Sequence, residues 1–228
     1  PNNRMALFAH CFTCSKDLSI VKTISKKLTG QGIAVLSFDF TGLGQSEGEF
    51  SDSNFSNNID DLIDTSNYLK ENYNEPTILI GHSLGGAAVI KAANMLDQVE
   101  AVITIGAPSQ AKHVSHLVTD KSKIETEGEA EISIGGRPFT IKKQFLEDLD
   151  EHDLREETEK LRTPLLIFHS PQDNIVGIDN AAEIYKHAHH PKSFISLDGA
   201  DHLLSDKEDA VYVATLIAAW MERYVNRK

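Results

Sequence analysis

Short apolar runs alternate along this chain with longer segments that have helical periodicity. The apolar runs lie at residues 5–10, 33–39, 77–80, 99–105, 165–169 and 193–197. After the first run, Val21 and Ile24 fall on one stripe of a helix. A last helix is expected at 206–225, where Ser205 and Glu208 have the form of a capping box. Because strands joined by helices run parallel, the alternation predicts an α/β fold: a mostly parallel sheet with helices on both faces.

Residues 107–160 interrupt the alternation. They carry acidic runs and an alternating apolar stretch from Ile132 to Ile141, which contains Gly135-Gly136 and predicts a β-hairpin. The segment is too short for an independent domain. We therefore expect a single domain over residues 1–228, with a small cap insertion at about 107–160 that lies over one end of the sheet.

Charge and hydropathy exclude two classes of partner. The chain has 228 residues, of which 34 are acidic and 22 basic, and its formal charge of −12 repels phosphate backbones. Its apolar runs are shorter than the roughly 20 residues that a membrane-spanning helix needs. We expect neither a nucleic-acid partner nor a membrane partner.

The chain has two cysteines, Cys11 and Cys14. Two cysteines make no disulfide framework in a chain of this length, so we expect a reducing compartment, the cytoplasm. The sequence starts at Pro1, one short turn before an apolar run, and we expect it to be a fragment of a longer protein.

The strongest motif is Gly81-His82-Ser83-Leu84-Gly85, between an expected strand and an expected helix. A serine on such a sharp turn stands clear of the sheet, and the two glycines permit the crowded backbone that the turn requires. The helix N-terminus directs free N–H groups and a positive dipole end to the same place. Ser83 is therefore the predicted nucleophile.

A serine hydroxyl is a weak nucleophile, so it needs a base, and the base needs an orienting acid. On this architecture the acid and then the histidine follow the serine, in loops after later strands. His202 is the predicted base among the ten histidines, and Asp173 is the predicted acid. Asp198 and Asp201 compete with Asp173, although Asp201 adjoins His202 too directly to reach its Nδ1.

The developing oxyanion requires two preorganised donors. One is expected to be the N–H of Leu84, which follows the nucleophile. The other is expected from the loop after the first strand, where the N–H of Phe12 takes the position.

With these positions assigned, the sequence resembles the α/β-hydrolase superfamily over nearly its whole length. Ser83 in its motif, Asp173 and His202 in order, and the segment 38–46 (FDFTGLGQS) carry the resemblance. The segment 9–17 (AHCFTCSKD) resembles the hydrolase half of bacterial proteins that carry an OsmC-like domain behind the hydrolase. Many relatives have glycine after the histidine of this loop, where this chain has Cys11.

The resemblance implies a serine esterase without a metal or organic cofactor, in a full-length protein with a fused OsmC-like domain. The compact insertion resembles that of feruloyl and cinnamoyl esterases. By that analogy we expect it to shape an acyl pocket, with Phe139, Gln144 and Phe145 as lining residues; packing within the insertion is the competing interpretation. The predicted reaction is hydrolysis of carboxylic esters of small or aromatic acyl groups through an acyl-enzyme.

Three other interpretations stay open. Cys11 and Cys14, between a strand and a helix, also have the layout of a dithiol redox centre. The chain could be a catalytically silent member of the superfamily that binds a ligand or a partner. The histidines at 187, 189 and 190 could form a metal cluster, although a solvated helix end explains them more simply.

Overall fold

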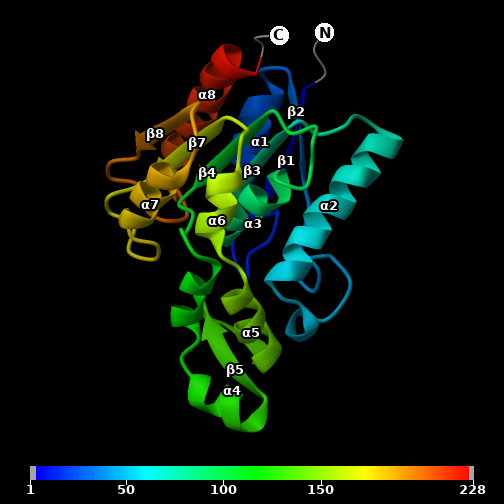
Figure 1. Ribbon diagram of the computed structural model, residues 1–228, viewed down its shortest axis with the longest axis vertical. Coiled ribbons are helices and arrows are strands. Elements are labelled where there is room, and N and C mark those ends of the chain that lie inside the picture. The colour runs from blue at the N-terminus through cyan, green and yellow to red at the C-terminus, as the bar shows by residue number, and fades with distance from the viewer. Residues whose placement is uncertain (1–3, 226–228) are drawn as a thin grey trace.

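The computed structural model describes residues 4–225. A six-stranded sheet forms its centre, in the order β2-β1-β3-β4-β7-β8, and every neighbouring pair is parallel (Figure 1). The strands are β1 (Arg4–Ala9), β2 (Ile33–Ser37), β3 (Ile78–His82), β4 (Ala101–Ile105), β7 (Leu165–His169) and β8 (Lys192–Ser196). The predicted parallel sheet is confirmed. Pro1, on which the expectation of a fragment rests, lies outside the described residues.

Helices cover both faces of the sheet. The helices are α1 (Ser19–Thr29), α2 (Phe55–Asn72), α3 (Leu84–Ala93), α6 (Leu154–Lys160), α7 (Asp179–His187) and α8 (Lys207–Tyr224). α1 and α8 pack against each other over one face, and α2, α3, α6 and α7 form the layer on the other. In β1, Leu7 joins the core under α2 and α3, whereas the next residue, Phe8, joins the core under α1 and α8. Both side chains are fully buried, as expected for a parallel sheet covered on two sides.

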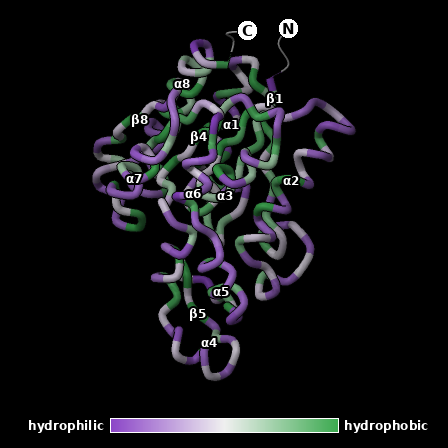
Figure 2. The backbone as a smooth tube through the Cα atoms, viewed as in Figure 1, coloured by the Kyte–Doolittle hydropathy of each residue, from purple (hydrophilic) through white to green (hydrophobic). Residues whose placement is uncertain are grey.

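The helix α2 shows how the sequence pattern sets the packing. Ile59, Leu62 and Leu69 recur at helical spacing and are buried against the sheet side. Figure 2 shows hydrophobic and hydrophilic stretches alternating along this helix. At its start, Asn54 accepts a hydrogen bond from the Asn57 amide, and the Asn57 side chain accepts one from the Asn54 amide, so that two otherwise free N–H groups are satisfied.

The expected insertion 107–160 contains the 3₁₀-helix η2 (Ala111–Leu117), α4 (Lys121–Glu127), β5 (Glu129–Ile134), β6 (Arg137–Lys142), α5 (Lys143–Glu151) and α6. The part from η2 to α5 projects from one end of the molecule, whereas α6 lies beside α3 in the helical layer (Figure 1). β5 and β6 pair antiparallel, with Ile132 opposite Phe139, and Gly135 and Gly136 both have positive φ in the turn. The predicted hairpin is confirmed.

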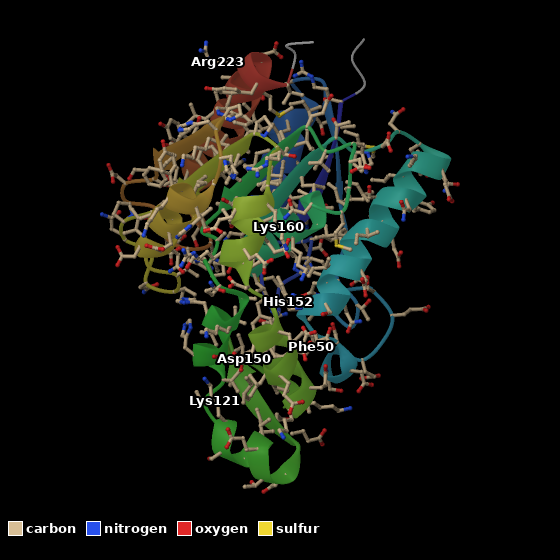
Figure 3. All side chains as sticks on the ribbon, viewed as in Figure 1. Phe50, Lys121, Asp150, His152, Lys160 and Arg223 are labelled. Atoms are coloured by element: carbon tan, nitrogen blue, oxygen red, sulfur yellow. A yellow bond between two sulfur atoms is a disulfide. The ribbon has the colours of Figure 1, made fainter. Side chains whose placement is uncertain are left out.

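A chain of polar contacts holds α5 against α2 and α3. Lys91 donates to Nδ1 of His152 (2.8 Å), so the proton of the neutral imidazole lies on Nε2, which donates to Oγ of Ser56 (2.9 Å). Ser56 in turn donates its hydroxyl (2.5 Å) and its amide (2.9 Å) to Asp148. Because His152 donates to this serine, it does not act as its base. The network fixes the part of the inserted segment that lies next to α2, where Figure 3 shows His152.

The start of α8 differs from the prediction. Its N-cap is Asp206, whose carboxylate accepts from the Glu208 amide, and not Ser205. The amide of Ser205 donates instead to the Asp201 carboxylate (2.8 Å), so Ser205 belongs to the turn that precedes the helix. The predicted capping box is therefore wrong, while the helix itself lies within one residue of the predicted range at each end.

Removing the Asp148 carboxylate tests how much the polar network between α5 and α2 contributes to stability. Asp148→Ala is expected to lower the free energy of unfolding by about 2 kcal/mol, because two donors of Ser56 lose a buried charged acceptor. Urea unfolding measures the change. Asp150→Ala, at an exposed position on the same helix, is the control and is expected to stay within about 0.5 kcal/mol of the parent. Equal effects of the two substitutions would contradict this role.

Candidate active site

The carboxyl ends of β3, β7 and β8 bring the three predicted triad residues together. Ser83 follows β3, Asp173 lies in the loop after β7, and His202 lies in the loop after β8. Nε2 of His202 is 3.0 Å from Oγ of Ser83, and its Nδ1 is 2.7 Å from Oδ2 of Asp173. The three side chains thus form one continuous hydrogen-bonded row. Asp198, a competing carboxylate, contacts the Ser196 hydroxyl instead (3.1 Å).

The backbone of Ser83 takes a conformation that places its side chain above the sheet. Its φ is 55°, in a region that residues other than glycine rarely adopt, and its amide donates to the carbonyl of Ile105 (2.9 Å). The two motif glycines are required by contact: a Cβ on Gly81 would lie 2.3 Å from the Gly85 carbonyl oxygen, and one on Gly85 would lie 2.4 Å from that of His10. The strand-to-helix turn therefore closes only with glycine at both positions.

The Asp173 carboxylate is held by its own loop. Its Oδ1 accepts from the amides of Ile175 and Val176, both at 2.9 Å, which leaves Oδ2 for His202. Burial alone would raise the pKa of Asp173, but the hydrogen bonds from His202 and from these amides outweigh it and hold the pKa below its ordinary value. His169, at the end of β7, is buried and contacts the Val176 carbonyl through Nε2 (2.7 Å).

His82 supports the candidate base from below. Its Nε2 lies 2.7 Å from the backbone carbonyl of His202, so Nε2 must carry the proton and donate it. The side chain is fully buried, and burial, followed by the proximity of His202, lowers its pKa to about 3. His82 thus fixes the main chain that carries the imidazole. This role of His82 could not be predicted from the sequence, where the only indication was a histidine next to the serine.

Gly106 is a second functional position without a clear motif. It follows β4 with a φ of 57°, and a Cβ there would lie 3.3 Å from Oδ2 of Asp173 and 3.4 Å from Nδ1 of His202. A larger residue would press on the hydrogen bond between these two groups. A glycine directly after an apolar strand was the only available signal.

The oxyanion loop, residues 10–16, lies against the start of α3. Its contact with Gly85 places Phe12 and Leu84 around the same small cavity, whose volume is about 10 Å³. Within the described residues, neither of their amides donates a hydrogen bond to a protein acceptor. His10 ties the loop down: its Nδ1 donates to the Cys11 carbonyl (2.8 Å), and its Nε2 accepts from the Phe40 amide (3.2 Å). The loop can therefore present two N–H groups to one oxygen.

A disulfide joins Cys11 and Cys14 across this loop. The sequence left a dithiol centre at these two cysteines open. The turn that closes with the hydrogen bond from the Cys14 amide to the Cys11 carbonyl (3.2 Å) brings their Cα atoms to 5.3 Å, within bonding range. Between them, Thr13 has a φ of 58°, and its carbonyl accepts a hydrogen bond from Arg137 of the hairpin.

Four phenylalanine rings gather beside the oxyanion loop. Phe12 stacks on Phe145 with 5.3 Å between centroids, and Phe50 lies 5.9 Å from Phe12 and 5.1 Å from Phe139. Gln144, also expected to line the pocket, donates to the Ser53 carbonyl (3.0 Å) and accepts from Asn54 (2.8 Å). Phe139 and Phe145 thus lie in an aromatic cluster next to the candidate site, whereas Gln144 holds the loop before α2.

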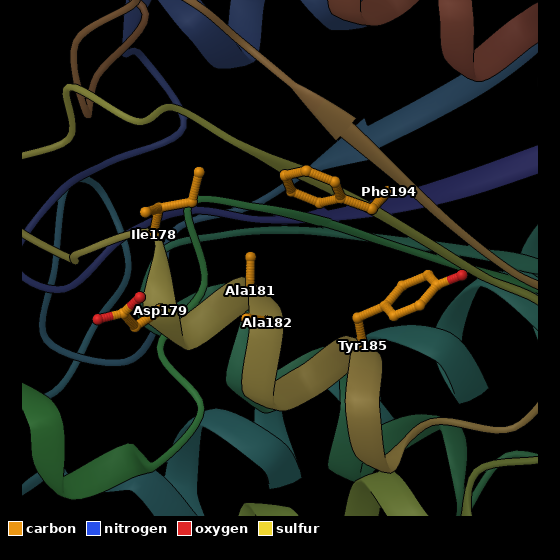
Figure 4. Close-up of a pocket in the computed structure, with 6 residues that line it drawn as sticks. All are labelled: Ile178, Asp179, Ala181, Ala182, Tyr185 and Phe194. Atoms are coloured by element: carbon orange, nitrogen blue, oxygen red, sulfur yellow. The ribbon is translucent and has the colours of Figure 1, made fainter.

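Other features of the surface lie apart from the triad. A cavity of about 560 Å³ opens between α7 and β8, where Figure 4 shows Ile178, Tyr185 and Phe194 around it.

Over residues 4–225, no group of three or more His, Cys, Asp or Glu side chains is arranged to hold a metal ion. His187 contacts Glu159 instead (2.8 Å). Within the same part of the chain, no helix has the length and apolarity needed to cross a membrane.

Comparisons with known proteins bear on the family and the fold. The family described as serine aminopeptidase, S33, a hydrolase family, matches residues 16–127. The crystal structure of the esterase domain of a Rhodothermus marinus protein is 51% identical, with a TM-score of 0.79, and the match covers 99% of this chain and 90% of that domain. An identity of 51% over nearly the whole of both chains shows that this chain and the esterase domain belong to one family.

More distant relatives share the fold. Est1E of Butyrivibrio proteoclasticus, in a structure with ferulic acid bound, is 20% identical with a TM-score of 0.81, over 100% of this chain and 92% of that one. Mouse palmitoyl-protein thioesterase ABHD10 is 26% identical over 78% of this chain and 62% of its own length. YfhR of Salmonella typhi, an uncharacterized protein, is 24% identical over 89% and 66% respectively. The chain thus spans slightly less than two thirds of these curated relatives. The likenesses confirm the predicted fold.

The buried state of His82 predicts an acid-sensitive stability. Between its ordinary pKa of 6.5 and its folded value of about 3, the unfolded chain binds a proton that the folded chain does not, so stability is lost as the pH falls through this window. We expect His82→Gln to reduce the slope of unfolding free energy against pH by up to ~1.4 kcal/mol per pH unit. Urea unfolding between pH 7 and 4 measures it. The exposed His189→Gln is the control; an unchanged slope in His82→Gln would contradict the assignment.

Proposed function

This chain belongs to the esterases of the α/β-hydrolase superfamily, and we propose that it hydrolyses carboxylic esters with Ser83 as nucleophile, through an acyl-enzyme. The observation that carries the proposal is the unbroken row from Oγ of Ser83 through His202 to Asp173, with gaps of 3.0 and 2.7 Å. Both distances lie within hydrogen-bond reach, as proton transfer between these groups requires.

In the first half of the reaction, the Ser83 hydroxyl attacks the ester carbonyl and Nε2 of His202 takes its proton. Asp173 accepts a hydrogen bond from Nδ1, which fixes the tautomer and stabilises the imidazolium that forms. The amides of Phe12 and Leu84 hold the oxyanion of the tetrahedral intermediate. Its collapse transfers the proton from His202 to the departing alcohol and leaves the acyl group on Ser83.

In the second half, water replaces the alcohol. His202 removes a proton from the water, which attacks the acyl carbonyl, and the same two amides hold the second oxyanion. The acid leaves and Ser83 regains its proton. None of these steps calls on a group from outside the chain other than the ester and water.

We assign the acyl group to the small or aromatic class. Phe12, Phe50 and Phe145 line a small cavity beside the oxyanion loop, and the ring of Phe139 contacts Phe50. Aromatic walls favour stacking with an aromatic acyl group, and a cavity of about 10 Å³ offers no room for a long alkyl chain. The likeness to Est1E, which binds ferulic acid in its structure, supports the aromatic choice.

Two finer points belong to the same proposal. The protein acts in the cytoplasm, where a disulfide such as Cys11–Cys14 is usually transient and redox-active. The full-length chain carries an OsmC-like domain after the hydrolase, as the resemblance of the segment 9–17 implies. The silent-member alternative is disfavoured, because a binding module has no need for a complete hydrogen-bonded triad under two unpaired amides.

Loss of the nucleophile tests the proposal directly. Ser83→Ala is expected to lower kcat for a short-chain aryl ester by about 10⁶-fold and to abolish labelling by a fluorophosphonate. Asp173→Asn is expected to lower kcat by about 10⁴-fold, because the imidazole loses its orienting acceptor. Steady-state kinetics measures both. Activity that survives in Ser83→Ala would overturn the mechanism.

Asp198→Asn is the matched control for the acid. Its carboxylate contacts only the Ser196 hydroxyl among described residues, and it lies in the same loop as His202. We expect its kcat to stay within about threefold of the parent. If Asp198→Asn rather than Asp173→Asn loses activity, the acid has been assigned wrongly.

Enlarging the aromatic cluster tests the acyl assignment. Phe145→Ala removes the ring that stacks on Phe12, and it is expected to raise kcat/KM for an octanoyl ester relative to an acetyl ester by about tenfold. Phe194→Ala, which removes a half-exposed ring from the separate cavity beside β8, is the control and is expected to leave the ratio unchanged. An unchanged ratio in Phe145→Ala would place the acyl group elsewhere.

A further inference from the structure

We propose that the Cys11–Cys14 disulfide is a site of thiol–disulfide exchange with a dithiol reductant, and that its state sets the oxyanion loop. The inference rests on the proposed function, because the bond spans Phe12, whose amide is the assigned oxyanion donor. It gives the two cysteines a role that ester hydrolysis by itself does not require.

The oxyanion loop is held by hydrogen bonds at its two ends, and the disulfide closes the turn between them. At one end, Cys11 is buried beside His10, which binds its carbonyl. At the other end, Lys16 donates its amide (2.7 Å) and its ammonium group (2.5 Å) to the Asp39 carboxylate. Between these anchors the chain carries Phe12 and Thr13, and the covalent bond closes the turn around them.

Thr13 shows that this turn is under strain. It is β-branched, and its φ of 58° is a conformation that such residues avoid. Besides the disulfide, the turn is held by the hydrogen bond from the Cys14 amide to the Cys11 carbonyl and by Arg137, which reaches the Thr13 carbonyl from the exposed hairpin. Without the covalent bond, rotation of Thr13 toward negative φ relieves the strain and opens the turn. The hydrogen bond from the Cys14 amide to the Cys11 carbonyl is then lost, and the peptide unit that contains this carbonyl and the Phe12 N–H is held by His10 alone.

The two sulfur atoms differ in access. Cys11 is only 4% exposed, whereas Cys14 is half-buried at the surface. A thiolate from solvent can therefore attack Sγ of Cys14 and not Sγ of Cys11. Cys14 is the residue of the pair that reaches the surface, so a thiolate from solvent approaches the disulfide from this end.

The exchange balances as a two-electron reduction. The first thiolate of the dithiol bonds to Sγ of Cys14 and breaks the bond to Cys11, which leaves as a thiolate and takes a proton from water. The second thiolate of the reductant then attacks the mixed disulfide, releases Cys14 as a thiol after protonation, and closes the disulfide of the reductant. Two protons and two electrons have passed from the dithiol to the protein.

The consequence for catalysis is a loss of transition-state stabilisation. When His10 alone holds the peptide unit between Cys11 and Phe12, the Phe12 N–H is no longer fixed toward the oxyanion. Loss of one such donor typically lowers kcat by 10² to 10³-fold. Leu84 and the triad do not belong to the loop, and the Phe12 ring stacks on Phe145, which also lies outside it. Substrate binding is therefore expected to change little. We expect the reduced protein to keep at most a tenth of its kcat, with KM within about threefold.

The test compares one preparation in both states. The protein is treated with dithiothreitol, the two thiols are counted with a chromogenic disulfide reagent, and kcat and KM are measured before reduction, after reduction and after reoxidation with oxidised glutathione. The inference predicts two thiols per chain, a kcat at least tenfold lower, and recovery on reoxidation. Failure of the thiols to appear in the folded protein, or equal kcat in the two states, would overturn it.

Two variants keep this outcome separate from the proposed function. Cys11→Ser combined with Cys14→Ser is expected to show the low kcat of the reduced form and no response to dithiothreitol. Ser83→Ala reports whether the activity belongs to the serine at all: if it is inactive while both redox states of the parent turn over equally, ester hydrolysis stands and the exchange inference falls. If the double variant does not fold, the reversible cycle on the parent protein decides alone.

Discussion

The conformation of Ser83 is the constraint on which the rest of the site depends. Its φ of 55° costs on the order of 1–3 kcal/mol, and the fold offsets this by fixing the residue between a buried strand and the first turn of α3. The hydrogen bond from the Ser83 amide to the Ile105 carbonyl and the close approach of Gly81 to Gly85 leave the turn no other arrangement. Because the Ser83 hydroxyl lies above the sheet, the loops after β7 and β8 can place Asp173 and His202 in one hydrogen-bonded row with it.

Three buried histidines hold those loops in place. His10, His82 and His169 each stand at the end of a strand, and each donates an N–H to a backbone carbonyl in the loop that carries the oxyanion donor, the base or the acid. Burial lowers the pKa of all three, so each stays neutral and keeps one fixed tautomer. The geometry of the triad thus depends on uncharged hydrogen bonds beneath it as much as on the contacts within it.

The sequence predicted what is encoded locally. The apolar runs gave the strands, and the setting of Ser83 gave the loops in which to seek Asp173 and His202, because parallel strands end at one edge of the sheet. The supporting roles were not predictable, since the partner of His82 lies 120 positions away and is a backbone carbonyl that no side chain pattern marks. The sequence left the pairing of Cys11 with Cys14 open, because the turn between the two residues decides whether they meet and their spacing alone does not fix that turn.

The most direct test of the account is the chemical identity of the intermediate. A slowly hydrolysed aromatic ester is mixed with the protein, the reaction is quenched with acid within the first turnovers, and the peptide that contains Ser83 is analysed by mass spectrometry. The account predicts a burst of alcohol equal to one per protein molecule and an acyl group on Ser83. An acyl group found on another residue, or the absence of any adduct together with the absence of a burst, would contradict it.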